Sequence, residues 1–151
     1  MIQIAAAQPQ DAEAFAELAE EMDRFYGASQ VEPLEIRLNQ IRRALFSDSP
    51  FAHALLAWNG DQLTGFATYS FLWPAAGLTR SLFLKELYVA ESKRRSGIGG
   101  QLMRAVFTAA TENECSRVEW QTELANAAAR AFYSYLGGKE LEGKVLYRVE
   151  S

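Results

Sequence analysis

Apolar residues recur at three- and four-residue spacing in two stretches of the first third of the chain. The first stretch contains Phe15, Leu18, Ala19, Met22 and Phe25, and the second contains Leu34, Leu38, Ile41 and Leu45. This spacing places the apolar side chains on one face of a helix. We therefore predict helices over residues 11–25 and 33–46, the first of them closed by Gly27.

The pattern then changes to short apolar runs that are typical of strands. Residues 51–58 and 62–70 flank Asn59-Gly60, a dipeptide that favours a tight hairpin turn, so we predict an antiparallel pair. Residues 81–89 are largely apolar on both faces, which indicates a strand inside a sheet. A weaker alternation in residues 1–6 predicts a first strand.

Helix and strand patterns alternate over the second half of the chain. Residues 97–112 have a helical pattern with Ile98, Leu102, Ala105 and Ala109 facing inward. We predict a strand over residues 117–122, a helix capped by Asn126 and ended by Gly137-Gly138, and a last strand over residues 144–149. This order of elements predicts one domain, residues 1–151, of mixed α/β (α+β) class.

Length and composition bound the class of protein. The 151 residues suit a single domain, and 49% hydrophobic with 23% charged residues is a globular profile. The single cysteine, Cys115, cannot form an internal disulfide, which favours a reducing, cytoplasmic compartment. No apolar run near the middle of the chain approaches the roughly 20 residues that span a bilayer, and residues 1–4 do not open a signal peptide, so we expect no membrane partner.

Charge is distributed unevenly along the chain. The net charge is −4, but residues 11–35 carry −7 and residues 80–104 carry +4. One interpretation is a cationic ligand near the first segment and an anionic ligand near the second; the other is that exposed helix faces are simply acidic. The overall negative balance argues against a nucleic-acid partner, which would need a clustered basic face.

The strand pattern of residues 81–89 leads through a turn rich in Arg and Gly directly into a helix. The first N–H groups of a helix lack carbonyl partners, the helix dipole adds about +0.5 charge there, and glycine lets the backbone approach a phosphate closely. The turn therefore fits a diphosphate, although an ordinary strand-to-helix turn is the alternative. It is neither a P-loop nor a dinucleotide-binding fingerprint.

Arg94-Arg95-Ser96-Gly97-Ile98-Gly99 resembles the signature Gln/Arg-x-x-Gly-x-Gly/Ala of the GNAT superfamily of acyl-CoA-dependent N-acetyltransferases. A second segment, a strand pattern followed by Asn126, Phe132-Tyr133 and Gly137, resembles the closing segment of that superfamily. The order of elements also fits, so the resemblance covers essentially the whole chain. Within that superfamily, the chain somewhat resembles the diamine and polyamine acetyltransferase branch.

The resemblance implies a splayed, mostly antiparallel central sheet with helices on both faces. Acetyl-CoA, as co-substrate, would enter between the strand that ends at Val89 and the strand over residues 117–122. Backbone N–H groups of the turn would hold the pyrophosphate. The main chain of Leu87 and Val89 would form hydrogen bonds to the pantetheine arm, and Asn126 would lie near the thioester. The binding residues implied are Leu87, Val89, Arg94, Arg95, Gly97, Gly99, Gly100 and Asn126.

Two residues are candidates for catalysis. By the resemblance Tyr133 lies near the thioester, where a phenol of pKa ~10 can donate a proton to a leaving thiolate of pKa ~8.5. Glu86 is the candidate base for the amine, because alternation of Leu84, Glu86 and Tyr88 along the strand places it beside the expected reaction centre. The alternatives are that Tyr133 only packs, that Glu86 pairs with Arg80, and that Asn126 is only a helix cap.

The chain departs from the related branch at two places. Where the polyamine branch carries two adjacent acidic residues, this chain has Lys85-Glu86. Arg95 stands where many members carry glycine. No metal site is expected, because the chain has a single histidine, His53, in an apolar strand.

The expected function is direct transfer of an acetyl group from acetyl-CoA to a primary amine. A small cationic amine is one candidate acceptor, because Glu20, Glu21 and Asp23 lie towards the end of the first helix; a peptide amine is another. The alternative is a non-catalytic acyl-CoA-binding or protein-interaction module. Many relatives dimerise, and the sequence leaves open whether this chain forms a homodimer.

Overall fold

The computed structural model describes residues 1–151. Its strands are β1 (Ile2–Ala6), β2 (His53–Asn59), β3 (Gln62–Leu72), β4 (Ser81–Val89) and β5 (Arg117–Trp120). Its helices are α1 (Ala12–Phe25), α2 (Leu34–Leu45), α3 (Ile98–Glu112) and α4 (Ala127–Tyr135), with short 3-10 turns η1 (Pro9–Asp11) and η2 (Glu91–Lys93). The chain divides into two compact units, Met1–Trp120 and Gln121–Ser151.

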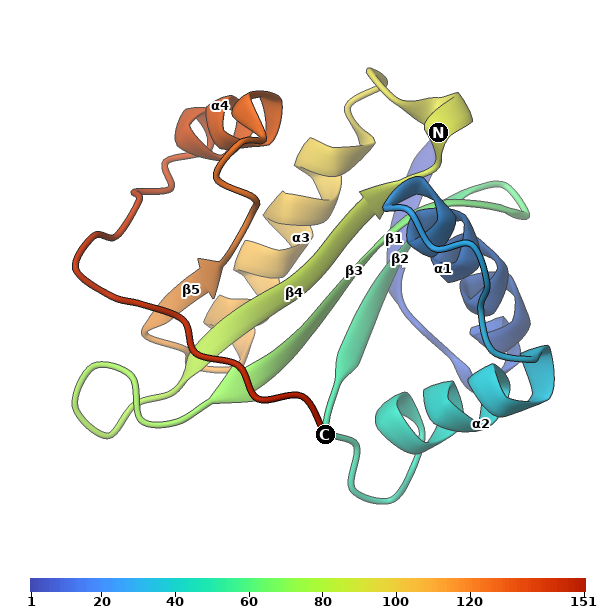
Figure 1. Cartoon of the computed structure of the whole chain (residues 1–151), viewed down its shortest axis with the longest axis horizontal. Helices are drawn as coiled ribbons and strands as arrows, with labels where there is room; N and C mark the ends of the chain where they lie inside the picture. The colour runs from blue at the N-terminus through green and yellow to red at the C-terminus, as the bar shows by residue number, and fades with distance from the viewer. The chain divides into compact units, whose positions relative to one another are not determined.

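The first unit contains a five-stranded sheet in the order β1-β2-β3-β4-β5 (Figure 1). The pairs β1–β2, β2–β3 and β3–β4 are antiparallel, and β5 runs parallel to β4. β2 and β3 form the predicted hairpin around Asn59-Gly60, where Gly60 has a φ of +62°. The mixed, mostly antiparallel sheet that the sequence predicts is confirmed.

Helices cover both faces of this sheet. On one face, α1 packs its apolar side chains on β2 and β3, and the Phe15 and Phe66 rings meet edge to face at 4.9 Å. α2 joins the same layer through Leu38, which packs against α1. On the other face lies α3, whose Ile98 and Leu102 contact the sheet at Gly65.

The buried face of α3 differs slightly from the predicted one. Ile98 and Leu102 are buried as expected, whereas Ala105 and Ala109 are only half-buried. Met103, Val106 and Ala110 are buried as well. Ala105 and Ala109 thus lie at the margin of the buried face.

The second unit contains α4 and no strand. The prediction of a strand over residues 144–149 is wrong for this structure, since these residues adopt no regular structure. Their large apolar side chains are exposed: Val145, Leu146, Tyr147 and Val149. The alternating pattern alone does not make a strand, because a strand also needs a neighbour that pairs its backbone N–H and C=O groups.

None of the helices combines the length and the apolar character that crossing a bilayer would require.

Candidate functional site

Towards its C-terminal end, β4 has no strand paired along the edge that β5 occupies earlier. β5 pairs with β4 only from Ser81 to Leu84, whereas β4 continues to Val89. The Ala90 N–H donates to the Thr64 carbonyl of β3 at 2.8 Å. In an antiparallel strand, every second residue turns its N–H and C=O groups to the same neighbouring strand, and the residues between them turn these groups away. The main-chain groups of Leu87 and Val89 therefore point away from β3, as a pantetheine-binding edge requires.

A bulge in β4 sets the direction of Glu86. Leu84 lies opposite Tyr69 and Glu86 lies opposite Thr68, so that Lys85 is an extra residue on β4. One extra residue reverses the alternation of faces along the strand. Glu86 thus shares the α1 side of the sheet with Tyr88, as expected, but the expectation that Leu84 shares this face is wrong.

The environment of Glu86 suits a proton acceptor. Burial raises the pKa of the Glu86 carboxyl, Lys85 opposes this shift, and the nearby Asp23 carboxylate raises the pKa further. No ion pair holds Glu86, and Arg80 instead donates to the Asn113 carbonyl at 3.0 and 3.1 Å. A carboxylate with a raised pKa is a stronger base than a solvated one.

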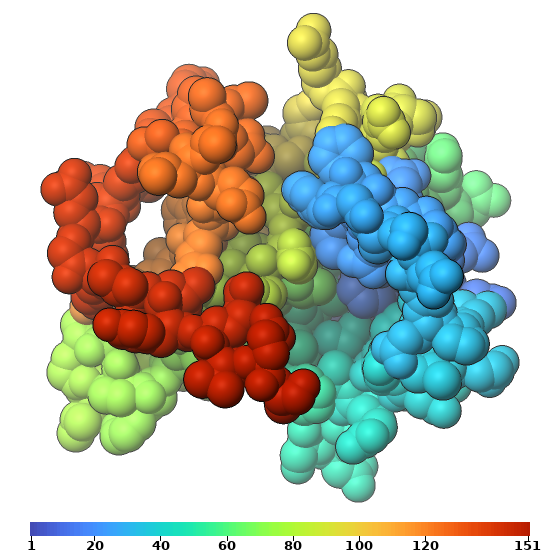
Figure 2. Space-filling view, viewed as in Figure 1, coloured from blue at the N-terminus to red at the C-terminus, as the bar shows by residue number.

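The turn after β4 and the start of α3 have the backbone shape of an anion site. Gly97 caps α3 with a φ of +83°, and a side chain built there would meet nothing within 4 Å. Gly99 and Gly100 form the first turn of α3, where N–H groups lack helical carbonyl partners. This open end of a helix suits an anion such as a diphosphate group. Figure 2 shows the turn, in yellow, at the surface beside the blue α1.

Arg95 adopts a φ of +65°, in the left-handed region. This conformation costs a residue other than glycine roughly 1–2 kcal/mol. The strain gives a physical reason why glycine is common at this place in the superfamily that the sequence resembles.

The Arg94 side chain fastens the turn to its surroundings. Its guanidinium lies 4.3 Å from the centre of the Phe25 ring and 5.3 Å from that of Tyr88, and its Nε donates to the Val89 carbonyl at 3.2 Å. The side chain thus contacts α1 and β4. Its predicted contact with phosphate stays a prediction.

Sequence reasoning missed the role of Glu21 in this region. Glu21 Oε2 accepts hydrogen bonds from the Tyr88 hydroxyl at 2.5 Å and from the Glu91 N–H at 3.1 Å. Burial, followed by the hydrogen bond to Glu21, raises the pKa of Tyr88 to about 12. The sequence signal was faint, since Glu21 is one of several acids on α1 and its partners are distant in sequence.

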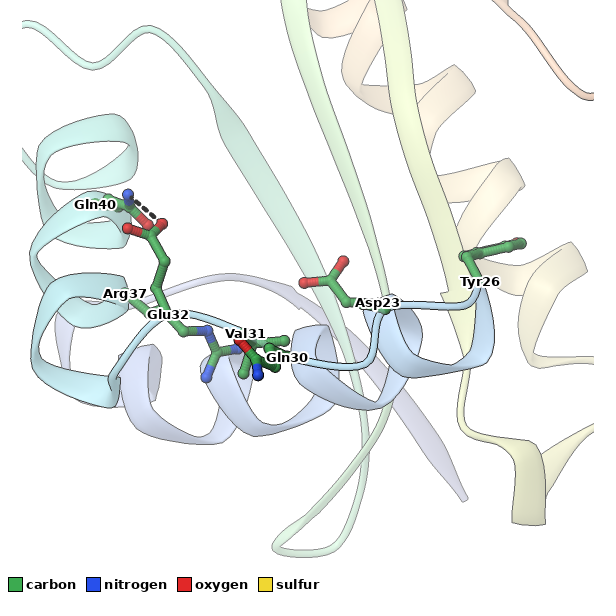
Figure 3. Close-up of a pocket in the computed structure, with 8 residues that line it drawn as sticks. Asp23, Tyr26, Gln30, Val31, Glu32, Arg37 and Gln40 are labelled. Atoms are coloured by element: carbon green, nitrogen blue, oxygen red, sulfur yellow. Dashed lines mark hydrogen bonds between the residues drawn. The ribbon is translucent and has the colours of Figure 1, made fainter.

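A cavity of about 390 Å³ lies where the chain passes from α1 to α2 (Figure 3). Its wall includes Asp23, Tyr26, Ala28, Gln30, Val31, Glu32, Arg37 and Gln40. The other acids that the sequence singled out are engaged elsewhere: Glu20 pairs with Arg24 at 3.0 Å and Arg37 at 3.4 Å, and Glu21 holds Tyr88. Asp23 is therefore the one of the three that lines the cavity.

Tyr133 and Asn126 belong to the second unit. Asn126 caps α4 as predicted, because its Oδ1 accepts the Ala129 N–H at 3.1 Å. Tyr133 is half-buried, and its ring lies 5.3 Å from that of Phe132. Their approach to a thioester stays a prediction that rests on the resemblance.

His53 packs among aromatic rings. Its imidazole stacks on Tyr69 at 5.3 Å and lies 5.2 Å from Phe71. Burial, with a smaller contribution from Arg80, lowers the pKa of His53, which keeps the ring neutral near pH 7. These contacts agree with the expected packing role.

Curated relatives of the chain are N-acetyltransferases. The chain is 27% identical over 128 residues to the thialysine N-epsilon-acetyltransferase of Mus musculus, a match that covers 78% of this chain and 75% of the relative. It is 29% identical over 149 residues to the D-amino-acid N-acetyltransferase HPA3 of Saccharomyces cerevisiae, over 97% of this chain and 89% of the relative.

Solved structures share the fold. An integron cassette protein from the mobile metagenome of V. cholerae, VCH_CASS6, superposes with a TM-score of 0.89 at 29% identity, over 99% of this chain and 93% of that one. The aminoglycoside N-acetyltransferase AAC(6')-Iy, solved in complex with CoA, superposes with a TM-score of 0.81 at 21% identity, over 100% of this chain and 96% of that one.

The sequence model of the Acetyltransferase (GNAT) family matches residues 15–137. This match includes β4, the turn that follows it and α4, which together carry the predicted site. The chain therefore belongs to the GNAT family of acetyltransferases.

Proposed function

We propose that this protein transfers the acetyl group of acetyl-CoA directly to a primary amine of a small cationic molecule. Family membership supports acetyl transfer from acetyl-CoA, and the two curated relatives act by name on thialysine and on D-amino acids. The observation that carries the choice of acceptor is Asp23, which lines the cavity and lies close enough to Glu86 to raise its pKa.

The acceptor amine must lose a proton before it can attack. An alkyl ammonium has a pKa near ~10.4 and no lone pair at neutral pH. Glu86, on the same face of β4 as Tyr88, accepts that proton directly or through a water molecule, and its raised pKa suits this role. Asp23 adds a second negative charge, which favours a cationic acceptor beside Glu86.

The acetyl donor is held by the chain's own backbone. Free N–H groups from Arg95 to Gly100 bind the diphosphate, and the edge of β4 at Leu87 and Val89 binds the pantetheine arm. The amine forms a bond to the thioester carbonyl carbon, the carbon–sulfur bond breaks, and the thiolate leaves with a proton from Tyr133. The second proton that the nitrogen loses returns to the Tyr133 phenolate. The products are an N-acetyl amine and free CoA.

We propose that the two units work as one catalytic domain. The diphosphate turn belongs to the first unit, and Asn126 and Tyr133 belong to the second. Activity then requires both. We place the reaction in the cytoplasm, where a lone thiol such as Cys115 stays reduced.

The test is to supply acetyl-CoA with a panel of diamines, amino acids, aminoglycosides and peptides, and to follow release of free thiol. The proposal expects thiol release with small cationic amines and a higher KM for them in Asp23→Asn. Gln30→Ala, which changes the same cavity without removing a charge, serves as the matched control. No thiol release above background with any amine, from protein that binds CoA, would instead support a non-catalytic acyl-CoA-binding module.

A further inference from the structure

The turn between β4 and α3 carries three adjacent cations. Lys93, Arg94 and Arg95 follow one another, and none of them takes part in an ion pair in the structure. Arg95 is also held in a left-handed conformation. Charge repulsion and backbone strain both oppose a fixed turn, so other contacts must hold it in place.

Helix α1 supplies these contacts from one of its faces. Glu21 and Phe25 are four residues apart and therefore lie on the same side of α1. Glu21 accepts the Glu91 N–H at the first residue of η2 and the hydroxyl of buried Tyr88 at the end of β4. The Phe25 ring lies beneath the Arg94 guanidinium at 4.3 Å. The start and the middle of the turn are thus both fastened to α1.

We propose that Glu21 is a positioning residue for the diphosphate-binding turn, an inference that rests on the proposed function. Two donors converge on its Oε2, and a carboxylate binds such donors more strongly than a neutral oxygen does. The hydrogen bonds of Glu21 go to the Tyr88 hydroxyl and to the backbone of η2. It holds Tyr88 and η2 so that the N–H groups from Arg95 to Gly100 are arranged before CoA arrives.

The inference predicts a loss of CoA affinity that separates from catalysis. In Glu21→Ala the Kd for CoA and the KM for acetyl-CoA should rise roughly tenfold, while kcat stays within about twofold. Glu21→Gln keeps an acceptor oxygen without the charge, so its Kd for CoA and its KM for acetyl-CoA should lie between those of wild type and Glu21→Ala. The control is Glu17→Ala, one turn earlier on α1, where the side chain is exposed and makes no hydrogen bond or ion pair.

A second readout needs no ligand. Trypsin cleaves after Lys and Arg, and the exposed Lys93-Arg94-Arg95 sequence is a substrate only as far as the turn can open. Limited proteolysis of ligand-free Glu21→Ala should cut this turn several times faster than wild type or Glu17→Ala. Melting temperatures measured in parallel separate local loosening of the turn from general loss of the fold.

Unchanged CoA affinity together with unchanged cleavage in Glu21→Ala and Glu21→Gln would overturn the inference. So would a fall in kcat with the KM for acetyl-CoA unaltered, which would place Glu21 in the chemistry. If Glu21→Ala does not fold, the comparison of Glu21→Gln with wild type decides. If wild-type protein binds no CoA, the proposed function fails, and the cleavage rates still decide whether Glu21 holds the turn.

Discussion

The bulge in β4 determines the face of the sheet on which Glu86 lies. The extra residue, Lys85, turns Glu86 to the α1 side of the sheet, where it is half-buried and faces Asp23. Without the bulge, Glu86 and Tyr88 would both lie on the same face of the sheet as Leu84. A single backbone irregularity thus brings the carboxylate to the side of the sheet that carries the α1–α2 cavity.

Glu86→Gln should lower kcat/KM for the amine by roughly 10²–10⁴, the usual contribution of a general base. Because the pKa of Glu86 is raised above 4.5, the acidic limb of the wild-type pH–rate profile should lie above pH 4.5 and should vanish in the variant. The exposed turn residue Asp61 offers a matched control, and Asp61→Asn should keep the wild-type profile. An unchanged acidic limb in Glu86→Gln would show that another group accepts the proton.

The same raised pKa links Glu86 to stability. The favourable contribution of the neutral carboxyl is fully present below pH 4.5 and is lost as the pH rises through the higher folded-state pKa. Glu86→Gln should therefore gain stability over wild type across that window. Denaturant titrations at several pH values measure the gain, and a difference independent of pH would contradict it.

Tyr133→Phe should reduce kcat while it leaves the affinity for CoA unchanged, because in the proposed reaction the phenol donates to the leaving thiolate. Tyr135 lies two residues further on α4 and is highly exposed, so Tyr135→Phe is the matched control. Steady-state rates and CoA titrations on both variants check this. Equal rates for the two variants would reduce Tyr133 to a packing residue.

At the scale of elements, the contact between β3 and α3 depends on the absence of a side chain. A Cβ at Gly65 would lie 2.9 Å from the Tyr88 carbonyl and 3.2 Å from both Ile98 Cγ2 and Leu102 Cδ1. The nearest of these atoms belongs to the backbone of β4, which cannot yield as a flexible side chain does. Gly65 therefore fixes the spacing between the sheet and the helix whose first turn is the proposed diphosphate site.

Gly65→Ala should destabilise the protein by about 1–3 kcal/mol, the usual cost of overpacking. Gly100→Ala, where an added Cβ meets only Arg104 at an ordinary 3.5 Å, should leave the stability unchanged or higher. Urea unfolding of both variants measures the difference. A Gly65→Ala variant as stable as wild type would show that β3 and α3 separate without cost.

The sequence predicts most elements because their signals are local. The apolar spacing from Phe15 to Phe25 and the Asn59-Gly60 turn each lie within one segment, and the structure confirms both elements. The bulge at Lys85 and the hydrogen bond from Tyr88 to Glu21 depend on residues far apart in sequence, so no local pattern could predict them. The strand expected over residues 144–149 failed for the same reason, since a strand depends on a partner elsewhere.

At the scale of the whole molecule, the acidic segment, residues 11–35, and the basic segment, residues 80–104, differ in how far their charges are paired. Two of the carboxylates in residues 11–35 have partners within the protein. Glu20 forms ion pairs with Arg24 and Arg37, and Glu21 accepts a hydrogen bond from Tyr88. Asp23 lines the cavity, and Lys93, Arg94 and Arg95 form no ion pair. The proposed function assigns the cationic amine to the first of these places and the anionic CoA to the second.

The central claim is that backbone N–H groups around Gly97 bind the diphosphate of CoA. Calorimetric titration with CoA should give heat with a stoichiometry of one, whereas pantetheine, which lacks the diphosphate, should bind at least a hundredfold more weakly, a loss of about 2.7 kcal/mol. Equal affinity for CoA and pantetheine, or no heat with CoA from folded protein, would contradict the account.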